Sequence, residues 1–233
     1  MKTVRIITQW IFILSLPILL FAASIRIAAN STELYRYGFN RYNINEETGL
    51  STAELNKVIT GLISYFNSGE EYISLTVTKD DKTFTLFNER ETAHLKDVKA
   101  LFKLDYRLLT GTFIYAFLYV FLSFILRQDK RQLMRGLIWG SGLTLALLAG
   151  IGLMVIVDFD WFFYQFHLIS FANDLWLLDP MTDYLIMLFP QGFWLDVTLF
   201  VAFLTVAMAL ILGGSGWWRL RKEKKAEEAE AAS

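Results

Sequence analysis

The sequence contains no cysteine, so disulfides, thiol catalysis, iron–sulfur clusters and cysteine-ligated zinc are all excluded. Charge is also scarce. Only 19% of the residues are charged, whereas soluble domains usually have about 25%. The net charge of −1 leaves no basic field that would attract nucleic acid. These shortages exclude a soluble globular enzyme, a disordered tail protein and a nucleic-acid-binding protein.

Apolar residues are abundant instead. They make up 55% of the 233 residues, and the mean hydropathy is +0.39. Four windows carry almost no charge over about 20 residues, a length that crosses a hydrocarbon core of about 30 Å. No alternating barrel pattern is visible, so these windows are predicted to be helices. They cover about 6–23, 109–126, 137–157 and 193–212.

The first window could instead belong to a signal peptide, because Lys2 and Arg5 precede it. However, the apolar run is longer than the core of a typical signal peptide, and the candidate cleavage zone carries Arg26. We therefore predict a retained transmembrane helix.

Basic residues cluster before the first span, between the second and third, and after the fourth, whereas 158–192 has no Lys or Arg. This alternation predicts that both termini are cytoplasmic. The predicted fold class is an all-α membrane protein with four transmembrane helices and a small α+β extracellular cap between the first two. Transmembrane helices are expected at 1–29, 108–126, 137–157 and 193–212, the cap at 30–107, a cytoplasmic linker at 127–136, an aromatic outer interfacial loop at 158–192, and a basic then acidic cytoplasmic tail at 213–233.

Small and aromatic residues mark two further features of the spans. Gly136, Gly140 and Thr144 are four residues apart, a spacing typical of close helix–helix packing. Trp217 and Trp218 precede the basic tail and are interpreted as an interfacial anchor. The tail itself is interpreted as a solvated extension.

The cap sequence predicts a helix, a hairpin and a second helix. A capping box at 51–54 begins an amphipathic helix that ends near 67–69. Residues 72–77 and 83–87 flank a polar turn and are typical of a hairpin. Asn88, with Glu91 three residues later, begins a second helix whose pattern continues toward the second span.

The outer loop holds twelve aromatic residues between positions 159 and 194. Aromatic side chains favour the membrane interface, so this segment is expected to lie at the membrane surface, partly re-entrant. The aromatic cluster is interpreted first as interfacial packing and second as a pocket for acyl chains. Asp158, Asp160 and Asp183 are interpreted as solvated loop charges.

The only two histidines, His94 and His167, are predicted to lie on the same outer side of the membrane. A single histidine in a helix is more often a packing residue. A shared side, nearby carboxylates and surrounding aromatics favour a functional pair, which could act as base, acid or metal ligand. A zinc site fits poorly, because no close-spaced histidine pair exists.

Polar residues flank both histidines at helical spacings. Arg90 and Asp97 lie four residues before and three residues after His94, so the three share one helix face. Asn173 and Asp174 follow His167 by about two turns if that helix continues.

Two sequence motifs together resemble those of a bacterial integral membrane family that includes the lipoprotein intramolecular transacylase. The residues of the first motif are Phe87, Asn88, Arg90, Glu91, His94, Asp97 and Val98. Those of the second are Phe166, His167, Phe171, Asn173, Asp174, Trp176, Asp179, Pro180, Thr182, Asp183, Phe193 and Trp194. The resemblance covers most of the chain, including the four helices and the cap.

The resemblance implies a membrane acyltransferase that acts on a diacylglyceryl-cysteine lipoprotein. The sn-2 acyl chain moves to the lipoprotein's own N-terminal amine and gives the lyso-form by acid–base catalysis with the two histidines, His94 and His167; the sequence does not assign which is the acid and which is the base. No cofactor or metal is needed, and the partners are the lipoprotein and membrane lipid, with a monomeric enzyme. The expected location is the bacterial cell membrane, with the active site at the outer leaflet.

Helical spacing and motif position suggest further roles. Supporting residues that orient the histidines or stabilise the oxyanion are expected to be Arg90, Asp97, Asn173, Asp174 and Asp179. The substrate pocket is expected to include Phe87, Tyr164, Phe166, Phe171 and Trp176. Two alternatives stay open: a non-catalytic membrane protein whose cap binds lipid or a partner, and a metal-dependent membrane hydrolase.

Overall fold

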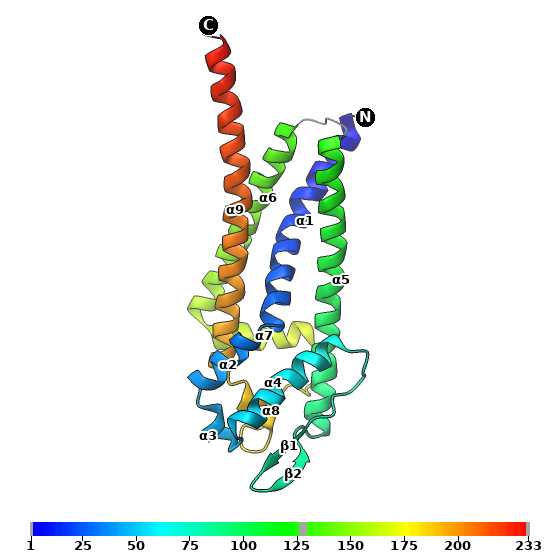
Figure 1. Cartoon of the computed structure of the whole chain (residues 1–233), viewed down its shortest axis with the longest axis vertical. Helices are drawn as coiled ribbons and strands as arrows, with labels where there is room; N and C mark the ends of the chain where they lie inside the picture. The colour runs from blue at the N-terminus through cyan, green and yellow to red at the C-terminus, as the bar shows by residue number, and fades with distance from the viewer. Residues whose placement is uncertain (1, 126–129, 232–233) are drawn as a thin grey trace. The chain divides into compact units, whose positions relative to one another are not determined.

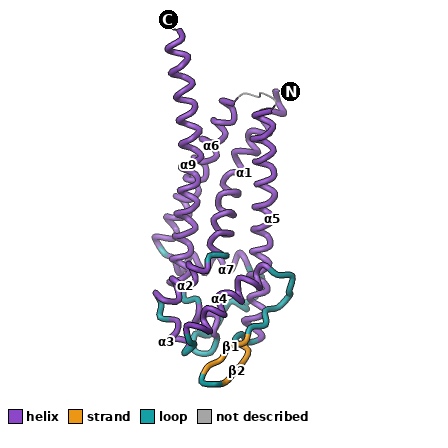
Figure 2. Tube along the Cα trace, viewed as in Figure 1, coloured by secondary structure: helices purple, strands orange, loops and turns teal. Residues whose placement is uncertain are grey.

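The computed structural model describes residues 2–125 and 130–231, which are mostly helical with one short hairpin (Figures 1 and 2). The elements in chain order are α1 (Lys2–Ala29), α2 (Thr32–Arg41), α3 (Ile44–Thr48), α4 (Thr52–Asn67), β1 (Thr76–Lys79), β2 (Lys82–Thr85), α5 (Glu89–Ile125), α6 (Lys130–Val157), α7 (Phe159–Ser170), α8 (Tyr184–Leu188) and α9 (Gln191–Ala231).

The chain divides into two compact units. The first, here called the bundle unit, comprises Met1–Ile25, Tyr106–Leu153 and Val201–Ser233. The second, the cap unit, comprises Arg26–Asp105 and Met154–Phe200.

Helices α1, α5, α6 and α9 supply the bundle unit, and each is long and apolar enough to cross a membrane. Many large apolar side chains on these helices are exposed, among them Trp139 at 69% and Phe203 at 68%. Such exposure is stable where the surrounding solvent is lipid rather than water. The protein is therefore an integral membrane protein, and the prediction of four transmembrane helices with a small two-stranded sheet is confirmed.

The bundle interior relies on close approach between helices. A Cβ atom added at Gly140 of α6 would lie 2.8 Å from Leu16 Cδ2, and one at Gly136 would lie 3.0 Å from Phe12 Cδ1. Thr144 is buried and donates its hydroxyl to the Gly140 carbonyl at 2.8 Å. The predicted small-residue packing on this helix is thus confirmed, because the glycines admit side chains from α1.

Several helices extend beyond the apolar windows. Helix α6 begins at Lys130 rather than at 137, and α9 continues through the tail to Ala231. The second cap helix and the second span form one helix, α5. Lys, Arg and Glu are good helix formers, so charge ends an apolar window without ending a helix. Residues 126–129, which include the predicted end of the second span and the start of the linker, lie outside the described residues.

The cap unit contains a hydrophobic core built from α2, α3, α4, the hairpin, the first turns of α5, α8 and the start of α9. Helices α2 and α3 were not predicted. Ser31 caps α2, where its hydroxyl accepts from the Leu34 amide at 3.2 Å. Tyr35 and Phe39, one turn apart, are the buried aromatic residues of α2. Only these two aromatics and Gly38 of the ten residues are buried, so the apolar face is short and lies in an otherwise polar segment.

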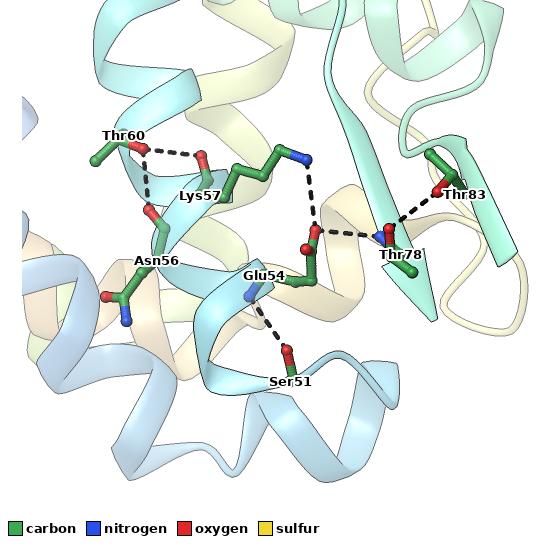
Figure 3. A network of polar contacts seen from close by, with 7 residues as sticks. All are labelled: Ser51, Glu54, Asn56, Lys57, Thr60, Thr78 and Thr83. Atoms are coloured by element: carbon green, nitrogen blue, oxygen red, sulfur yellow. Dashed lines mark hydrogen bonds and ion pairs between the residues drawn. The ribbon is translucent and has the colours of Figure 1, made fainter. Parts of the chain in front are cut away.

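Helix α4 and the hairpin are tied together by Glu54 (Figure 3). Ser51 caps α4, as predicted, by accepting from the Glu54 amide at 3.3 Å. The Glu54 carboxylate accepts from the Thr78 amide of β1 at 3.1 Å and pairs with Lys57 at 3.7 Å. The strands are shorter than predicted, and Asp80 and Asp81 turn with positive φ, as a tight hairpin requires.

The segment interpreted as an outer loop contains helix α7. Asp158 is its N-cap and accepts from the Trp161 amide at 2.9 Å, so it is not merely a solvated charge. Asp183 is 7% exposed and accepts from Asn88 Nδ2 at 2.8 Å, so the solvated interpretation was wrong for this residue as well. Asp160 is exposed to solvent on α7, where Gln191 donates to it at 2.5 Å. Hydropathy missed α7 because its aromatic residues lie on all sides of the helix.

Candidate active site

Helix α7 and the part of α5 that belongs to the cap unit bring His94 and His167 together. Their ring centroids are 6.3 Å apart, and the ring planes differ by 28°. Both side chains are buried, at 6% and 9% exposure. The two histidines, 73 positions apart in the sequence, are therefore buried within one aromatic cluster.

A buried capping box determines where α5 begins and hence where His94 lies. Asn88 Oδ1 accepts from the Glu91 amide at 3.0 Å, and Glu91 Oε2 accepts from the Asn88 amide at 2.7 Å. The other Glu91 oxygen accepts from the Leu185 amide at 2.6 Å. Burial raises the pKa of the Glu91 carboxyl, although these backbone hydrogen bonds oppose the increase. His94 follows Glu91 by three residues, so this carboxyl group anchors the turn that carries the imidazole.

The protonation of His167 is set by its own helix. Nδ1 lies 2.8 Å from the carbonyl oxygen of Phe163, one turn earlier on α7. A carbonyl can only accept, so Nδ1 carries the hydrogen and Nε2 of the neutral ring is left with a free lone pair. A neutral His167 can therefore remove a proton from a group that approaches Nε2.

Aromatic rings surround His167. Phe163, Trp176, Phe166 and Phe171 lie at centroid distances of 4.4, 4.9, 5.5 and 5.6 Å. Phe171 also contacts His94, at 5.0 Å. The result is an apolar site with few polar groups other than the two imidazoles.

His94 lies outside the membrane-spanning part of α5, because every charged residue of this helix falls between Glu89 and Arg107 and the uncharged part is 108–125. Its Nδ1 has no hydrogen-bond partner among the described residues. Burial lowers the pKa of His94 to about 4, with a contribution from His167 and opposition from Asp97. Burial also lowers the pKa of His167. Both rings are therefore neutral at neutral pH.

The structure brings four of the predicted supporting residues together. Their hydrogen bonds join α5 to the segment 173–175 and do not involve the histidines. Arg90 donates to the carbonyl oxygen of Asp174 at 2.6 Å and more weakly to that of Leu175 at 3.5 Å. Asn173 Nδ2 donates to Asp97 Oδ2 at 2.9 Å. Within the described part of the chain, no hydrogen bond joins these side chains to either imidazole. We call these contacts the 173–175 clamp.

The predicted pocket residues separate into two groups. Phe166, Phe171 and Trp176 contact His167, and Tyr164 packs on Trp176 at 5.4 Å. Phe87 instead lies in the hydrophobic core of the cap unit.

Asp179, predicted as a supporting residue, stabilises a turn. Its carboxylate accepts from the Met181 amide at 2.9 Å, and its own amide donates to Asp183 at 2.8 Å. No described contact joins it to either histidine.

Sequence reasoning missed Phe163 as a site residue. Its carbonyl and ring both contact His167, and its ring stacks on Trp194 at 6.0 Å. The four-residue spacing from Phe163 to His167 would have revealed this contact if 159–170 had been predicted as a helix.

The donor set for a metal is poor. Among the described residues, no group of three or more His, Asp or Glu side chains could hold a metal ion. The metal-dependent alternative therefore gains no support from this geometry.

Comparison with known proteins agrees with this architecture. The family model for the lipoprotein intramolecular transacylase Lit matches residues 10–194. An uncharacterized protein from Aquifex aeolicus (strain VF5) is 26% identical over 214 residues, which cover 89% of this chain and 92% of that protein.

Solved structures give the same fold. The membrane integral lipoprotein intramolecular transacylase Lit from Bacillus cereus superposes with a TM-score of 0.81 at 19% identity, covering 97% of this chain and 100% of that one. A variant of the same protein with a mutated histidine gives a TM-score of 0.76 at 17% identity, covering 97% and 96% of the two chains.

Proposed function

The chain belongs to the lipoprotein intramolecular transacylase family, and from this membership we propose that it moves an acyl chain within one lipoprotein molecule. The substrate is a lipoprotein whose N-terminal cysteine carries a diacylglyceryl thioether. The acyl group on the middle glyceryl oxygen moves to the cysteine α-amine, and the product is the lyso-form lipoprotein.

The observation that carries this proposal is the pair of buried imidazoles at 6.3 Å. The lowered pKa values favour neutral rings, which an acid–base mechanism at neutral pH requires. The α-amine has a reference pKa of about 8, so part of it is already neutral near pH 7, and its nitrogen becomes acidic enough for an imidazole to deprotonate once it bonds to the acyl carbon.

We assign the base role to His167, because the Phe163 carbonyl holds the hydrogen on Nδ1 and leaves Nε2 free. The neutral amine attacks the acyl carbon, and its nitrogen gives a proton to Nε2 as the C–N bond forms. The same proton then passes to the glyceryl oxygen as the C–O bond breaks. Atoms and protons balance without water or a cofactor.

His94 is assigned to the developing oxyanion. A neutral imidazole carries one N–H, and no described protein group occupies Nδ1 of His94. A hydrogen bond from this ring to the oxyanion would stabilise the tetrahedral intermediate in a site with little water. The aromatic walls would hold the amine and the ester in the cyclic arrangement that closes through sulfur and the glyceryl carbons.

The 173–175 clamp is assigned a positioning role. Arg90 and Asp97 lie one turn before and one turn after His94 on α5, and both hold the segment that leads to Trp176. Because Trp176 packs on His167, this arrangement would set the distance between the imidazoles.

We further propose that the site faces the outer leaflet of the bacterial membrane and that both termini are cytoplasmic. The distribution of basic residues supports this orientation, because 158–192 has no Lys or Arg whereas the ends of the chain are basic.

The test is reconstitution of the purified protein in vesicles with a synthetic diacylglyceryl-cysteine lipopeptide and nothing else. Intramolecular transfer leaves the mass of the lipopeptide unchanged, so tandem mass spectrometry must locate the acyl chain on the amine. A hydrolase would release the chain and lower the mass. A chelator that abolished turnover would favour the metal-dependent alternative.

His94→Ala and His167→Ala should each lower the rate at least about a hundredfold, the usual contribution of an oxyanion donor and of a general base, respectively. Thr60→Ala, an exposed change on α4, serves as the control and should retain normal activity. A normal rate from either histidine variant would remove the role given to that residue.

A further inference from the structure

The end of α9 carries a groove that the proposed reaction does not use. Trp217, Trp218, Arg221, Lys222 and Lys225 line this groove, here called the basic groove, which has a volume of about 380 Å³. Spacings of one, four, five and eight residues place all five side chains on one face of the helix.

The two tryptophans orient the cations. The Arg221 guanidinium lies over the Trp217 ring at 5.1 Å, and the Lys222 ammonium lies over the Trp218 ring at 5.6 Å. Both rings are exposed, at 54% and 58%. Cation–π contacts of this kind hold long basic side chains in place without neutralising their charge.

The acidic residues of the same helix are directed elsewhere. Glu223 and Glu227 both pair with Arg131 of α6, Glu223 at 3.4 Å. Glu228 pairs with Lys224 at 3.6 Å. Within residues 2–125 and 130–231, no carboxylate pairs with Arg221, Lys222 or Lys225. The tail is therefore a helix in which Glu223 and Glu227 are held against α6 while the three cations of the basic groove have no paired carboxylate among the described residues, rather than a plain solvated extension.

We propose that the basic groove binds the phosphate of an anionic phospholipid from the leaflet at the C-terminal end of α9. The groove directly follows the apolar window 193–212 of a transmembrane helix, and exposed tryptophans are typical of the headgroup region. Basic clusters next to a transmembrane helix attract anionic lipid through charge. A soluble phosphate would gain nothing from the tryptophans, whereas a lipid keeps its acyl chains beside the apolar window.

The experiment is native mass spectrometry of the full-length protein in detergent, titrated with phosphatidylglycerol or phosphatidylcholine. The test variant is Arg221→Gln/Lys222→Gln. The matched control is Arg219→Gln/Lys224→Gln, which removes the same two charges from the same helix but outside the groove. We expect the test variant to weaken the first phosphatidylglycerol binding event about tenfold and the control to change it less than about twofold. Arg221→Lys/Lys222→Arg should retain binding.

Several results would overturn the proposal. An equal loss of phosphatidylglycerol binding in both double variants would indicate diffuse charge attraction rather than a site. No loss of binding in either variant would exclude the basic groove as the lipid-binding site. Equal binding of phosphatidylcholine would exclude selection for an anionic lipid. Displacement of phosphatidylglycerol by millimolar inorganic phosphate would indicate a site for soluble anions.

Discussion

The bundle unit and the cap unit are stabilised in different ways. In the bundle unit, glycines admit neighbouring side chains, and large apolar residues such as Trp139 and Phe203 remain exposed. In the cap unit, a hydrophobic core is combined with polar contacts between distant segments, such as Glu91 with Leu185. Lipid supplies no hydrophobic force between helices, so close packing must hold them, whereas water drives the cap core together. Substitutions should therefore act by steric fit in one unit and by lost hydrogen bonds in the other.

The largest effect is expected at the buried carboxyl group of the cap unit. Glu91→Ala leaves the amides of Asn88 and Leu185 without an acceptor, which should lower cap stability by about 3 kcal/mol. Glu91→Gln can serve only one of these amides through its single oxygen and should cost less. Hydrogen exchange of the cap unit measures both. Glu89→Ala, an exposed change in the same turn, is the control, and an equal loss there would contradict the role of Glu91.

Steric fit in the bundle unit is tested by making the same glycine-to-valine change at two positions of α6. Gly140→Val places new atoms against Leu16 and should destabilise the bundle by about 2 kcal/mol through overpacking. A Cβ atom added at Gly142 would meet nothing within 4 Å, so Gly142→Val should have little effect. Thermal unfolding in detergent compares the two variants. Similar melting temperatures for the two variants would contradict the prediction that only one of these two glycines faces packed side chains.

Acid should weaken the cap unit selectively. The unfolded chain takes up a proton at His94 near its ordinary pKa of 6.5, whereas the folded chain does so only near a pKa of about 4. Between these values the folded state binds fewer protons, so stability falls as the pH drops. The contribution of His94 to this loss should reach about 2 kcal/mol between pH 7 and pH 5, whereas the raised pKa values of Glu91 and Asp105 in the same unit act in the opposite direction. Hydrogen exchange at both pH values measures it, and His94→Gln should flatten the dependence.

The smallest effect is expected at the 173–175 clamp. Arg90→Ala should lower kcat about tenfold by loosening the distance between the imidazoles, with KM little changed. Arg90→Lys should restore only part of kcat, because one ammonium group replaces the fork that reaches two carbonyls. Lipopeptide kinetics measure both constants. Arg36→Ala, an exposed arginine elsewhere in the cap unit, is the control. A change confined to stability would indicate a purely structural role.

The sequence predicted the transmembrane helices well, because a long uncharged window has few alternatives. It also identified the Asn88–Glu91 capping box, since both partners are three residues apart. Helix α7 was missed because its aromatics gave no clear apolar face. That omission hid the Phe163 carbonyl, although it lies only four residues from His167.

The predicted site residues likewise include features that the sequence identified and contacts that only the structure showed. Arg90 and Asp97 were identified from their spacing to His94, but their observed partners are in 173–175. Phe87 was grouped with the pocket because it begins the first motif, and the structure places it in the cap core.

By itself, the sequence determined that this chain enters a membrane, where its apolar windows lie, and which few residues can titrate near neutral pH. These properties depend on local composition and on spacing within single helices. Only the tertiary structure decided that the two imidazoles meet, that Asp183 and Glu91 are buried, and that Glu223 and Glu227 of the tail pair with Arg131 of α6. These depend on contacts between distant segments, and no local pattern encodes which distant partner a side chain will find.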